Sequence, residues 1–281
     1  MIQIKNIKKS YQDFLLDCSL TIEKGSVTGI IGKNGAGKST LYKAILNLIN
    51  IDSGNILVFN KDIKELDVKD KADIGVVLAD SFFSSYLNIK DIRKIMMDSY
   101  ETFDVTFFDK KVNEFELPVN KAIKSFSFGM KAKLKMLCAL SHNAKILLLD
   151  EPTLGLDVIA RDEILELLRE YMAKDSDNTI MISSHIASDL ESLCDDIYMI
   201  DDGKIILHED TDVLLSNYAI LKVDDQTYES IDKNYIYKVK KEDYGYALLT
   251  NQKQFYYENY PKIIIQNCSI DDVIYMMIKG K

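Results

Sequence analysis

The sequence predicts an α/β fold built on a parallel sheet, followed by a small α+β appendage at the carboxyl end. Residues 29–40, GIIGKNGAGKST, hold four of the 12 glycines and lie between an apolar, β-branched run and a stretch with helical spacing. Residues 146–150, ILLLD, begin with an aliphatic run of the kind found in strands that are covered on both faces. The tail after about residue 217 has a different composition, because it holds ten of the 16 tyrosines.

The overall composition narrows the possible functions. The chain has 281 residues, 47% of them hydrophobic, which is enough for one large domain or a domain with an appendage. The formal net charge of −9 argues against DNA or RNA as the main partner, because nucleic-acid binders carry a basic surface. The four cysteines show no paired spacing, which disfavours a metal or disulfide framework and fits a reducing compartment. We expect neither a signal peptide nor a membrane span, since no apolar run approaches the roughly 20 residues that cross a bilayer.

The glycine-rich stretch has the pattern of a phosphate-binding loop. Residues 26–31 predict a buried strand and residues 41–48 predict a helix, and the loop between them matches G-x-x-x-x-G-K-[ST]. Backbone N–H groups of such a loop, with those at the helix start, surround phosphate oxygens. Lys38 can then reach the β- and γ-phosphates, while the hydroxyl of Ser39 can bind Mg²⁺. The residues expected at the nucleotide are Gly32, Asn34, Gly35, Ala36, Gly37, Lys38, Ser39 and Thr40.

An acidic pair follows the aliphatic strand. Asp150 ends the strand, at the edge where open α/β sheets bind ligands, and its carboxylate can hold Mg²⁺. Glu151 comes next and can polarise an attacking water as a general base. Asp-Glu-Pro is also a plausible exposed turn, but its pairing with the glycine-rich loop favours a nucleotide site.

With one further motif, the chain up to about residue 210 resembles the ATP-binding cassette ATPases, the motor subunits of ABC transporters. Residues 125–131, SFSFGMK, resemble the signature loop of that family, usually LSGGQ. Ser127 and Gly129 match the loop, whereas Phe128 replaces its first glycine. The resemblance implies that Ser127 and Gly129 bind ATP held by an opposite subunit, so that two subunits pair head to tail around two MgATP. A serine is also a good helix N-cap, and a plain helix start is the alternative.

Three more residues match positions of the same family. Residues 154–157, LGLD, resemble the loop that links the two sites of the dimer, which assigns Asp157 to the nucleotide-binding set. His185 follows an apolar strand and resembles the switch histidine that contacts the γ-phosphate; a structural histidine is the alternative. Tyr11 matches the aromatic residue that stacks on adenine, although it also fits a surface or core tyrosine.

One position departs from the family pattern. The family has a glutamine after the strand at residues 74–78, where it touches Mg²⁺ and couples the site to the membrane subunit. This chain has Ala79 there, followed by Asp80. Alanine offers no side-chain oxygen, whereas the carboxylate of Asp80 can serve as a Mg²⁺ ligand. The predicted metal ligands are therefore Ser39, Asp150 and Asp80.

The resemblance also implies an architecture for the part of the chain that it covers: an ABC-type P-loop NTPase with a RecA-like core, an antiparallel β-subdomain and a helical subdomain at about residues 81–142. The α+β appendage follows this part. We divide the chain into an ATPase domain, residues 1–212, and an accessory domain, residues 213–281. The groove of the helical subdomain receives a coupling helix of the membrane protein in this family, and an aromatic cluster at its start fits either that groove or the core. The cluster consists of Phe82, Phe83, Tyr86 and Leu87.

The appendage has its own predicted elements. Its strands are expected at residues 220–223, 235–239, 246–250 and 262–266, and Ser269 is expected to cap a last helix. The tyrosines fit strand positions of a folded extension, and a contact with a second subunit or the membrane subunit is the alternative.

The function implied by the resemblance is that of an ATPase that hydrolyses ATP to ADP and phosphate and drives a separate integral membrane permease. It would act at the cytoplasmic face of the cell membrane, as a homodimer or heterodimer, without nucleic acid. The single cassette and the SFGMK sequence resemble exporters of bacitracin, lantibiotics or amphipathic peptides. The alternative is a soluble ABC ATPase of translation or DNA repair, which usually has two cassettes or a long coiled coil; no sustained heptads occur here. A sensor that barely hydrolyses ATP is disfavoured by Glu151 and His185.

Overall fold

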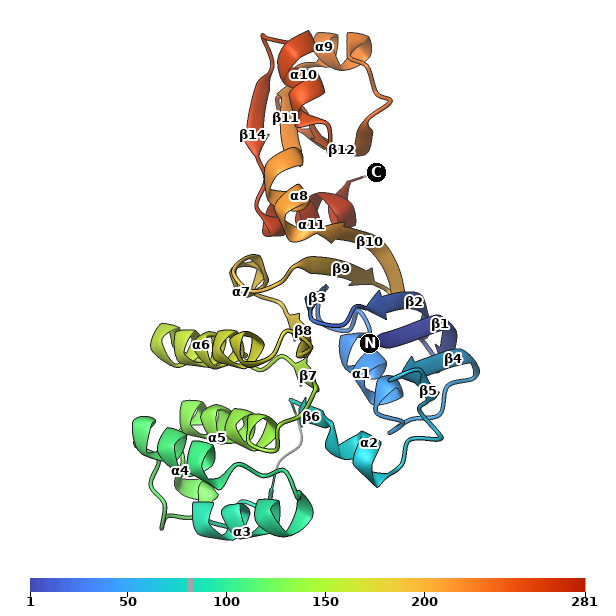
Figure 1. The fold of residues 1–281 in the computed structure, drawn as a ribbon. Helices are drawn as coiled ribbons and strands as arrows, with labels where there is room; N and C mark the ends of the chain where they lie inside the picture. Colours follow the sequence, from blue (N-terminus) through green and yellow to red (C-terminus); the bar gives the residue numbers. More distant parts are fainter. Residues whose placement is uncertain (80–82, 281) are drawn as a thin grey trace.

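The computed structural model describes residues 1–79 and 83–280 and contains three sheets with their helices. In Figure 1 the helices α3 to α6 lie on one side of the central sheet, the strands β1, β2, β4 and β5 lie on the other, and the appendage stands at one end. Within the described ranges, no helix has the length and apolar character needed to span a bilayer.

The central sheet has six strands in the order β10-β9-β3-β8-β7-β6. All neighbours are parallel except β9 and β10, which form an antiparallel hairpin. Every residue of β3 and β7 is buried, as the apolar runs predict. The strands are β3 (Val27–Ile31), β6 (Ile74–Val77), β7 (Ile146–Asp150), β8 (Thr179–Ser184), β9 (Asp196–Asp201) and β10 (Lys204–Asp210).

Helices pack around this sheet and connect its strands. The helix after the glycine-rich loop ends at Ile45 rather than Leu48, because Asn47 adopts a left-handed conformation with φ 53°. The helix after β7 begins at Val158, directly after its N-cap Asp157, and Val158 and Ile159 are exposed. These helices are α1 (Lys38–Ile45), α2 (Val68–Ala72), α6 (Val158–Lys174) and α7 (Ala187–Glu191).

The antiparallel β-subdomain has the strand order β2-β1-β4-β5. Ser53 and Gly54 are the first two residues of β4. Gly54 lies at an irregularity of the pairing with φ 91°, and a Cβ there would collide with the carbonyl oxygen of Asn6. The strands are β1 (Ile2–Ser10), β2 (Leu15–Ile22), β4 (Ser53–Val58) and β5 (Lys61–Asp62).

The helical subdomain follows β6, as predicted. Its helices share the main apolar core through buried residues such as Phe108, Leu134 and Leu137. Of the predicted aromatic cluster, Phe83 and Leu87 pack against this core, Tyr86 is exposed, and Phe82 lies outside the described residues. The elements are α3 (Ile89–Ser99), α4 (Val105–Glu114), the 3₁₀ helix η1 (Ile123–Ser125) and α5 (Phe128–Leu140).

The appendage has a four-stranded antiparallel sheet in the order β12-β13-β11-β14. All four predicted strands are present, and Ser269 caps the last helix in a reciprocal pair with Asp272, as predicted. Three short helices, α8 to α10, add to the predicted elements. The elements are α8 (Thr211–Asn217), β11 (Ala219–Val223), α9 (Asp225–Ser230), β12 (Ile236–Glu242), β13 (Gly245–Thr250), α10 (Lys253–Asn259), β14 (Ile264–Asn267) and α11 (Ile270–Lys279).

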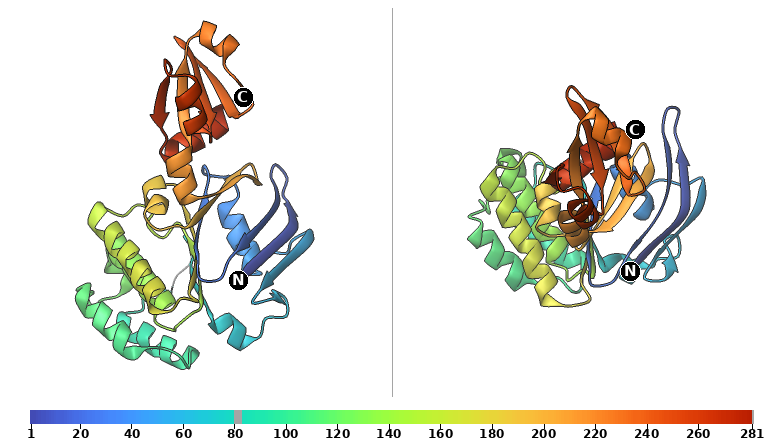
Figure 2. Two further views of the ribbon diagram at one scale, coloured as in Figure 1. Left: turned by 45° about the horizontal axis from the view of Figure 1, so that its top comes forward. Right: turned by 90° about the horizontal axis from the view of Figure 1, so that it is seen from above.

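The appendage packs directly on the ATPase domain, near α7 and β10 (Figure 2). Leu190 and Cys194 on the one side and Ile270 and Val273 on the other belong to the same buried apolar cluster. The backbone N–H of Ile270 donates a hydrogen bond to a carboxylate oxygen of Glu191 at 2.9 Å. The predicted boundary at residue 212 therefore lies between two parts of the chain that contribute to one apolar core.

Candidate functional site

A cleft of about 360 Å³ lies at the carboxyl end of the parallel strands, where α/β sheets bind ligands. The glycine-rich loop forms one wall of this cleft, and residues after β6, β7 and β8 form the other. The structure thus brings together most of the residues predicted for the nucleotide and for catalysis. The lining residues are Phe14, Lys33, Asn34, Gly35, Ala36, Gly37, Lys38, Ser39, Thr40, Ala79, Glu151, Leu154 and His185.

The loop leads straight into α1 with the backbone turned toward the cleft. Gly37 precedes the helix with φ 113°, a value that strongly favours glycine, and a Cβ there would lie 2.8 Å from the ring of Phe14. Within the described part of the chain, no side chain caps α1. Its first N–H groups are therefore available to an anion, and the helix dipole favours negative charge at the same point.

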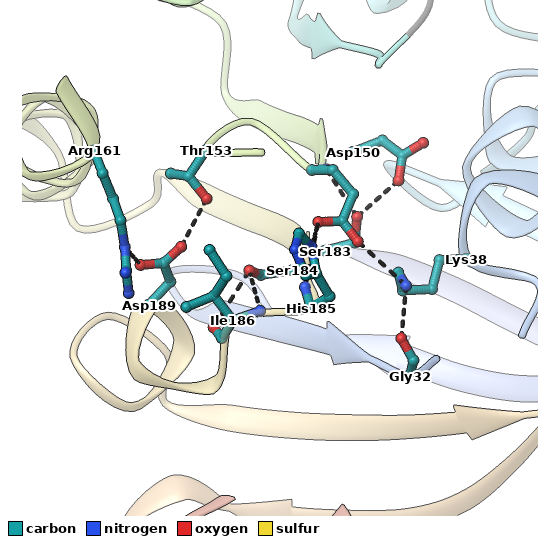
Figure 3. Close-up of polar contacts among 11 residues, drawn as sticks. Gly32, Lys38, Asp150, Thr153, Arg161, Ser183, Ser184, His185, Ile186 and Asp189 are labelled. Carbon is teal, nitrogen blue, oxygen red and sulfur yellow. Dashed lines mark hydrogen bonds and ion pairs between the residues drawn. The ribbon is translucent and has the colours of Figure 1, made fainter. Parts of the chain in front are cut away.

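Three side chains meet at the centre of the cleft. The Lys38 ammonium donates to the Gly32 carbonyl at 2.7 Å and lies 3.2 Å from Oε1 of Glu151. The second carboxylate oxygen of Glu151 lies 2.7 Å from Nδ1 of His185 and accepts the backbone N–H of His185 at 3.2 Å. The side chains of Lys38 and Glu151 are only 6% and 10% exposed. Figure 3 shows Lys38 and His185 converging on this point from separate elements.

The backbone holds Glu151 in an unusual conformation. Its φ is 53°, which costs free energy for a residue other than glycine and is common at functional sites. Its backbone N–H donates to the hydroxyl of Ser183 at 3.0 Å. The adjacent strand β8 therefore helps to fix the direction of the Glu151 side chain.

Asp150 lies deeper than Glu151. It is 2% exposed, and one of its carboxylate oxygens accepts the hydroxyl of Ser183 at 2.7 Å. Ser183 was missed in the sequence, although it pairs directly with Asp150 in the register of β7 and β8. Its position at the end of the next predicted strand is the signal that could have found it.

The oxygen donors at the cleft fit a magnesium ion in their chemistry. Ser39 lines the cleft with a hydroxyl group, and Asp150 offers a carboxylate at the same edge of the sheet. Mg²⁺ keeps several waters and binds through one or two carboxylates together with substrate phosphates. The described residues contain no group of three or more His, Cys, Asp or Glu side chains that could hold a metal ion by themselves. Asp80 lies outside the described residues.

A buried polar cluster ties the neighbouring segments together. Asp189 on α7 is fully buried and accepts the hydroxyl of Thr153 at 2.7 Å. Its other oxygen is bound by the guanidinium of Arg161 on α6, which also donates to Ser188 at 2.6 Å. This cluster joins the segment after Glu151 to the segment after His185 (Figure 3). It was not predicted from the sequence, because its members belong to three elements.

Some predicted residues lie outside the cleft. Ser127 is exposed and caps α5 by accepting the N–H of Met130 at 3.2 Å, so the structural role named as its alternative is present. Asp157 caps α6 in the same way, through the N–H of Ala160. Gly129 lies in the first turn of α5. The nucleotide contacts of these residues across a dimer stay predictions.

Phe14 lines the cleft with an aromatic ring, and the sequence reasoning missed it. Tyr11 is 49% exposed and does not line the cleft, and its ring centroid lies 6.4 Å from that of Phe14. Both rings belong to the connection between β1 and β2. The contact of Tyr11 with adenine stays a prediction.

The sequence comparisons with known proteins point to one family. The model of the family described as ABC transporter matches residues 15–154. The chain is 32% identical to the ABC transporter ATP-binding protein YtrB of Bacillus subtilis (strain 168), over 79% of this chain and 76% of that protein. It is 36% identical to the lantibiotic transport ATP-binding protein SrtF of Streptococcus pyogenes, over 75% of this chain and 92% of that protein.

Solved structures confirm the predicted fold class. An ATP-binding subunit of an ABC transporter superposes with a TM-score of 0.68 and 24% identity, covering 76% of this chain and 91% of that one. A dimeric ATP-binding cassette in a post-hydrolysis state, bound to ADP and Pi, superposes with a TM-score of 0.65 and 22% identity, covering 75% of this chain and 99% of that one. The family model, the relatives and the fold lead to one conclusion: the chain belongs to the ABC transporter family, as one of its ATP-binding and ATP-hydrolysing subunits.

Proposed function

We propose that this chain hydrolyses MgATP with Glu151 as the general base and Lys38 and His185 as phosphate-binding groups. The observation that carries the proposal is the contact of Glu151 with both Lys38 and His185 inside the glycine-loop cleft. Water attacks the γ-phosphorus, Glu151 accepts its proton, and the bond to the ADP oxygen breaks. Mg²⁺ held by Ser39 and Asp150 would neutralise charge on the phosphates.

In the resting arrangement Glu151 pairs with Lys38, so a phosphate must compete for the ammonium. A γ-phosphate that binds Lys38 and the free N–H groups of α1 would release the carboxylate. Glu151 is then free to accept a proton from water, while its contact with His185 keeps it at the edge of the cleft. Nucleotide binding and base activation are coupled in this scheme.

We also propose that two such subunits pair head to tail, with Ser127 and Gly129 at the N-terminus of α5 facing the partner's ATP. Large apolar side chains near these segments are exposed, which suits burial in a subunit interface. Val158 is 80% exposed and Phe128 59% exposed. The helix start at Ser127 supplies N–H groups for an anion.

The membrane permease would dock at the helical subdomain, which would hold the protein at the cytoplasmic face of the membrane. A groove of about 370 Å³ runs beside the edge strand β6 and suits an apolar coupling helix. It is lined in part by Val76, Phe83, Met96, Tyr100 and His142.

Export of a peptide antimicrobial is the proposed task. It rests on the relatives alone: SrtF is named for lantibiotic transport, and a bacitracin transport protein, BcrA of Bacillus licheniformis, is 30% identical over 73% of this chain and 68% of that protein. The cargo itself would contact the permease rather than this chain.

The test is to tag the protein in its native cell, solubilise the membranes in mild detergent and identify the co-purifying proteins. An integral membrane protein in comparable amount would support the proposal, and its sequence would narrow the cargo. Ribosomes or DNA-repair proteins without a permease would refute the transport role and favour the soluble class of ABC ATPases. Both outcomes are compatible with ATP hydrolysis by this chain.

A further inference from the structure

We infer that Lys135 is a positioning residue for ATP hydrolysis, because it ties helix α5 to the wall of the nucleotide cleft. Its ammonium donates hydrogen bonds to the backbone carbonyl oxygens of Leu78 at 3.2 Å and Ala79 at 3.1 Å. The contact crosses from the helical subdomain to the central sheet. It lies in the segment where this chain has Ala79 at the position of the family's glutamine.

The carbonyls that Lys135 binds need a donor. Strand β6 is the edge of the central sheet, and its pairing with β7 ends at Val77. Beyond that point, Leu78 and Ala79 pair with no strand among the described residues. An ammonium group on a flexible four-carbon stem, with three donors, can serve two neighbouring carbonyls at once. The contact therefore fixes the path of the chain as it leaves β6.

The fixed segment is part of the nucleotide cleft. Ala79 lines the cleft together with Glu151 and His185. Lys135 and Ala79 also line a smaller cavity of about 110 Å³, and Asp150 and Glu151 line the same cavity. A shift of Lys135 would thus move a wall that faces the proposed general base.

The other end of the connection is the start of α5. Ser127 caps the helix eight positions before Lys135, and at 1.5 Å per residue this is roughly 12 Å along the axis. Leu134 and Leu137 are fully buried, so the helix is anchored as a rigid element in the apolar core. Any displacement of the Ser127 end would therefore reach Ala79 through Lys135.

The experiment must distinguish a lysine that only stabilises the fold from one that couples α5 to the wall of the nucleotide cleft. The test compares wild type with Lys135→Met, Lys135→Arg and Lys133→Met in the full-length chain. Lys133 is a matched control: it lies on the same helix and also uses its ammonium, in an ion pair with Glu163 of α6 at 2.5 Å. Arginine at position 135 retains the charge and the donors.

The readouts are hydrogen exchange of amides with and without the non-hydrolysable analogue AMP-PNP and Mg²⁺, and kcat and KM for ATP. In wild type and in Lys133→Met, the analogue should slow exchange in the glycine-rich loop and in residues 128–140. In Lys135→Met the analogue should still protect the glycine-rich loop but should no longer protect residues 128–140. KM should stay within about twofold of the wild-type value, and kcat should fall about tenfold. Lys135→Arg should recover at least half of the wild-type kcat.

The inference is overturned if Lys135→Met retains wild-type protection of residues 128–140 and wild-type kcat. It is also overturned if Lys133→Met causes the same loss, because the effect would then be general to α5. Should Lys135→Met fail to fold, Lys135→Gln replaces it, with the same loss expected since the amide is shorter and uncharged. Binding of AMP-PNP to the glycine-rich loop tests the nucleotide site separately.

Discussion

Replacing Glu151 by glutamine tests the central contact of the cleft. The carboxylate lies 3.2 Å from the Lys38 ammonium and 2.7 Å from Nδ1 of His185, and the pair with Lys38 is largely shielded from solvent. Glutamine has nearly the same shape but no charge. It therefore weakens the hold on Lys38 and removes the proton acceptor without opening a cavity.

The expected magnitudes follow from these contacts. A hydrogen bond to a charged group contributes about 1.5–3 kcal/mol. Glutamine keeps a bond to the Lys38 ammonium at the lower end of this range but loses the attraction between the two opposite charges. If the contact between residue 151 and Lys38 is weaker by roughly 1.4 kcal/mol, a phosphate competes more easily for the Lys38 ammonium. This free energy corresponds to a factor of about ten in the affinity for ATP. Removal of a general base costs about 10² to 10⁴ in rate. Glu151→Gln should thus bind ATP about tenfold more tightly and hydrolyse it at least about 10²-fold more slowly.

The assay combines ATP binding by calorimetry, phosphate release, and size-exclusion chromatography in the presence of MgATP. We expect tighter binding, little phosphate and a trapped dimer. The control is Glu163→Gln, which removes a carboxylate paired with Lys133 on another face and should change none of these. Unchanged hydrolysis would exclude Glu151 as the base. Lost hydrolysis with unchanged affinity would refute the competition for Lys38.

Three further predictions concern the loop, a buried histidine and the appendage. Lys38→Ala should abolish nucleotide binding in equilibrium dialysis, and normal binding would contradict the loop assignment. Burial lowers the pKa of His142, so the unfolded chain binds a proton first as the pH falls below about 6.5. The free energy of unfolding in urea should be lower at pH 5.8 than at pH 7.5, by at most about 1.4 kcal/mol per pH unit from this group, and His142→Asn should reduce the difference. A chain ending at residue 212 should lose thermal stability, because it exposes Leu190 and Cys194; an unchanged Tm would show an independent appendage.

The elements around the cleft were predictable because their signals are local. The aliphatic run before Asp150 and the glycine pattern before Lys38 each lie within a short segment, and both occur where expected. The distances between segments were not predictable. Glu151 contacts both Lys38 and His185 only because β7 and β8 are neighbours in the sheet beside β3. Strand order depends on long-range packing, which periodicity does not report.

The connection between β1 and β2 shows that prediction from sequence is limited even within a short segment. Tyr11 and Phe14 are three positions apart, and either ring fits a stacking role by type. The backbone path places the two rings differently: Phe14 directly precedes β2 and its ring lies against Gly37, whereas Tyr11 follows β1 and is about half exposed. A side chain at Gly37 would displace Phe14, so the glycine needed for phosphate binding also makes room for the ring.

The contact of the appendage with the ATPase domain was not predictable for a related reason. Its tyrosine content separates it from the ATPase domain, and composition reports the chemistry of strands and surfaces. It does not report which apolar faces meet. In the structure α11 packs on α7, which begins two positions after His185, and Glu191 at the end of α7 accepts the N–H of Ile270. The segment that carries His185 and the last helix of the chain therefore share one packing unit, and neither can shift without repacking the other.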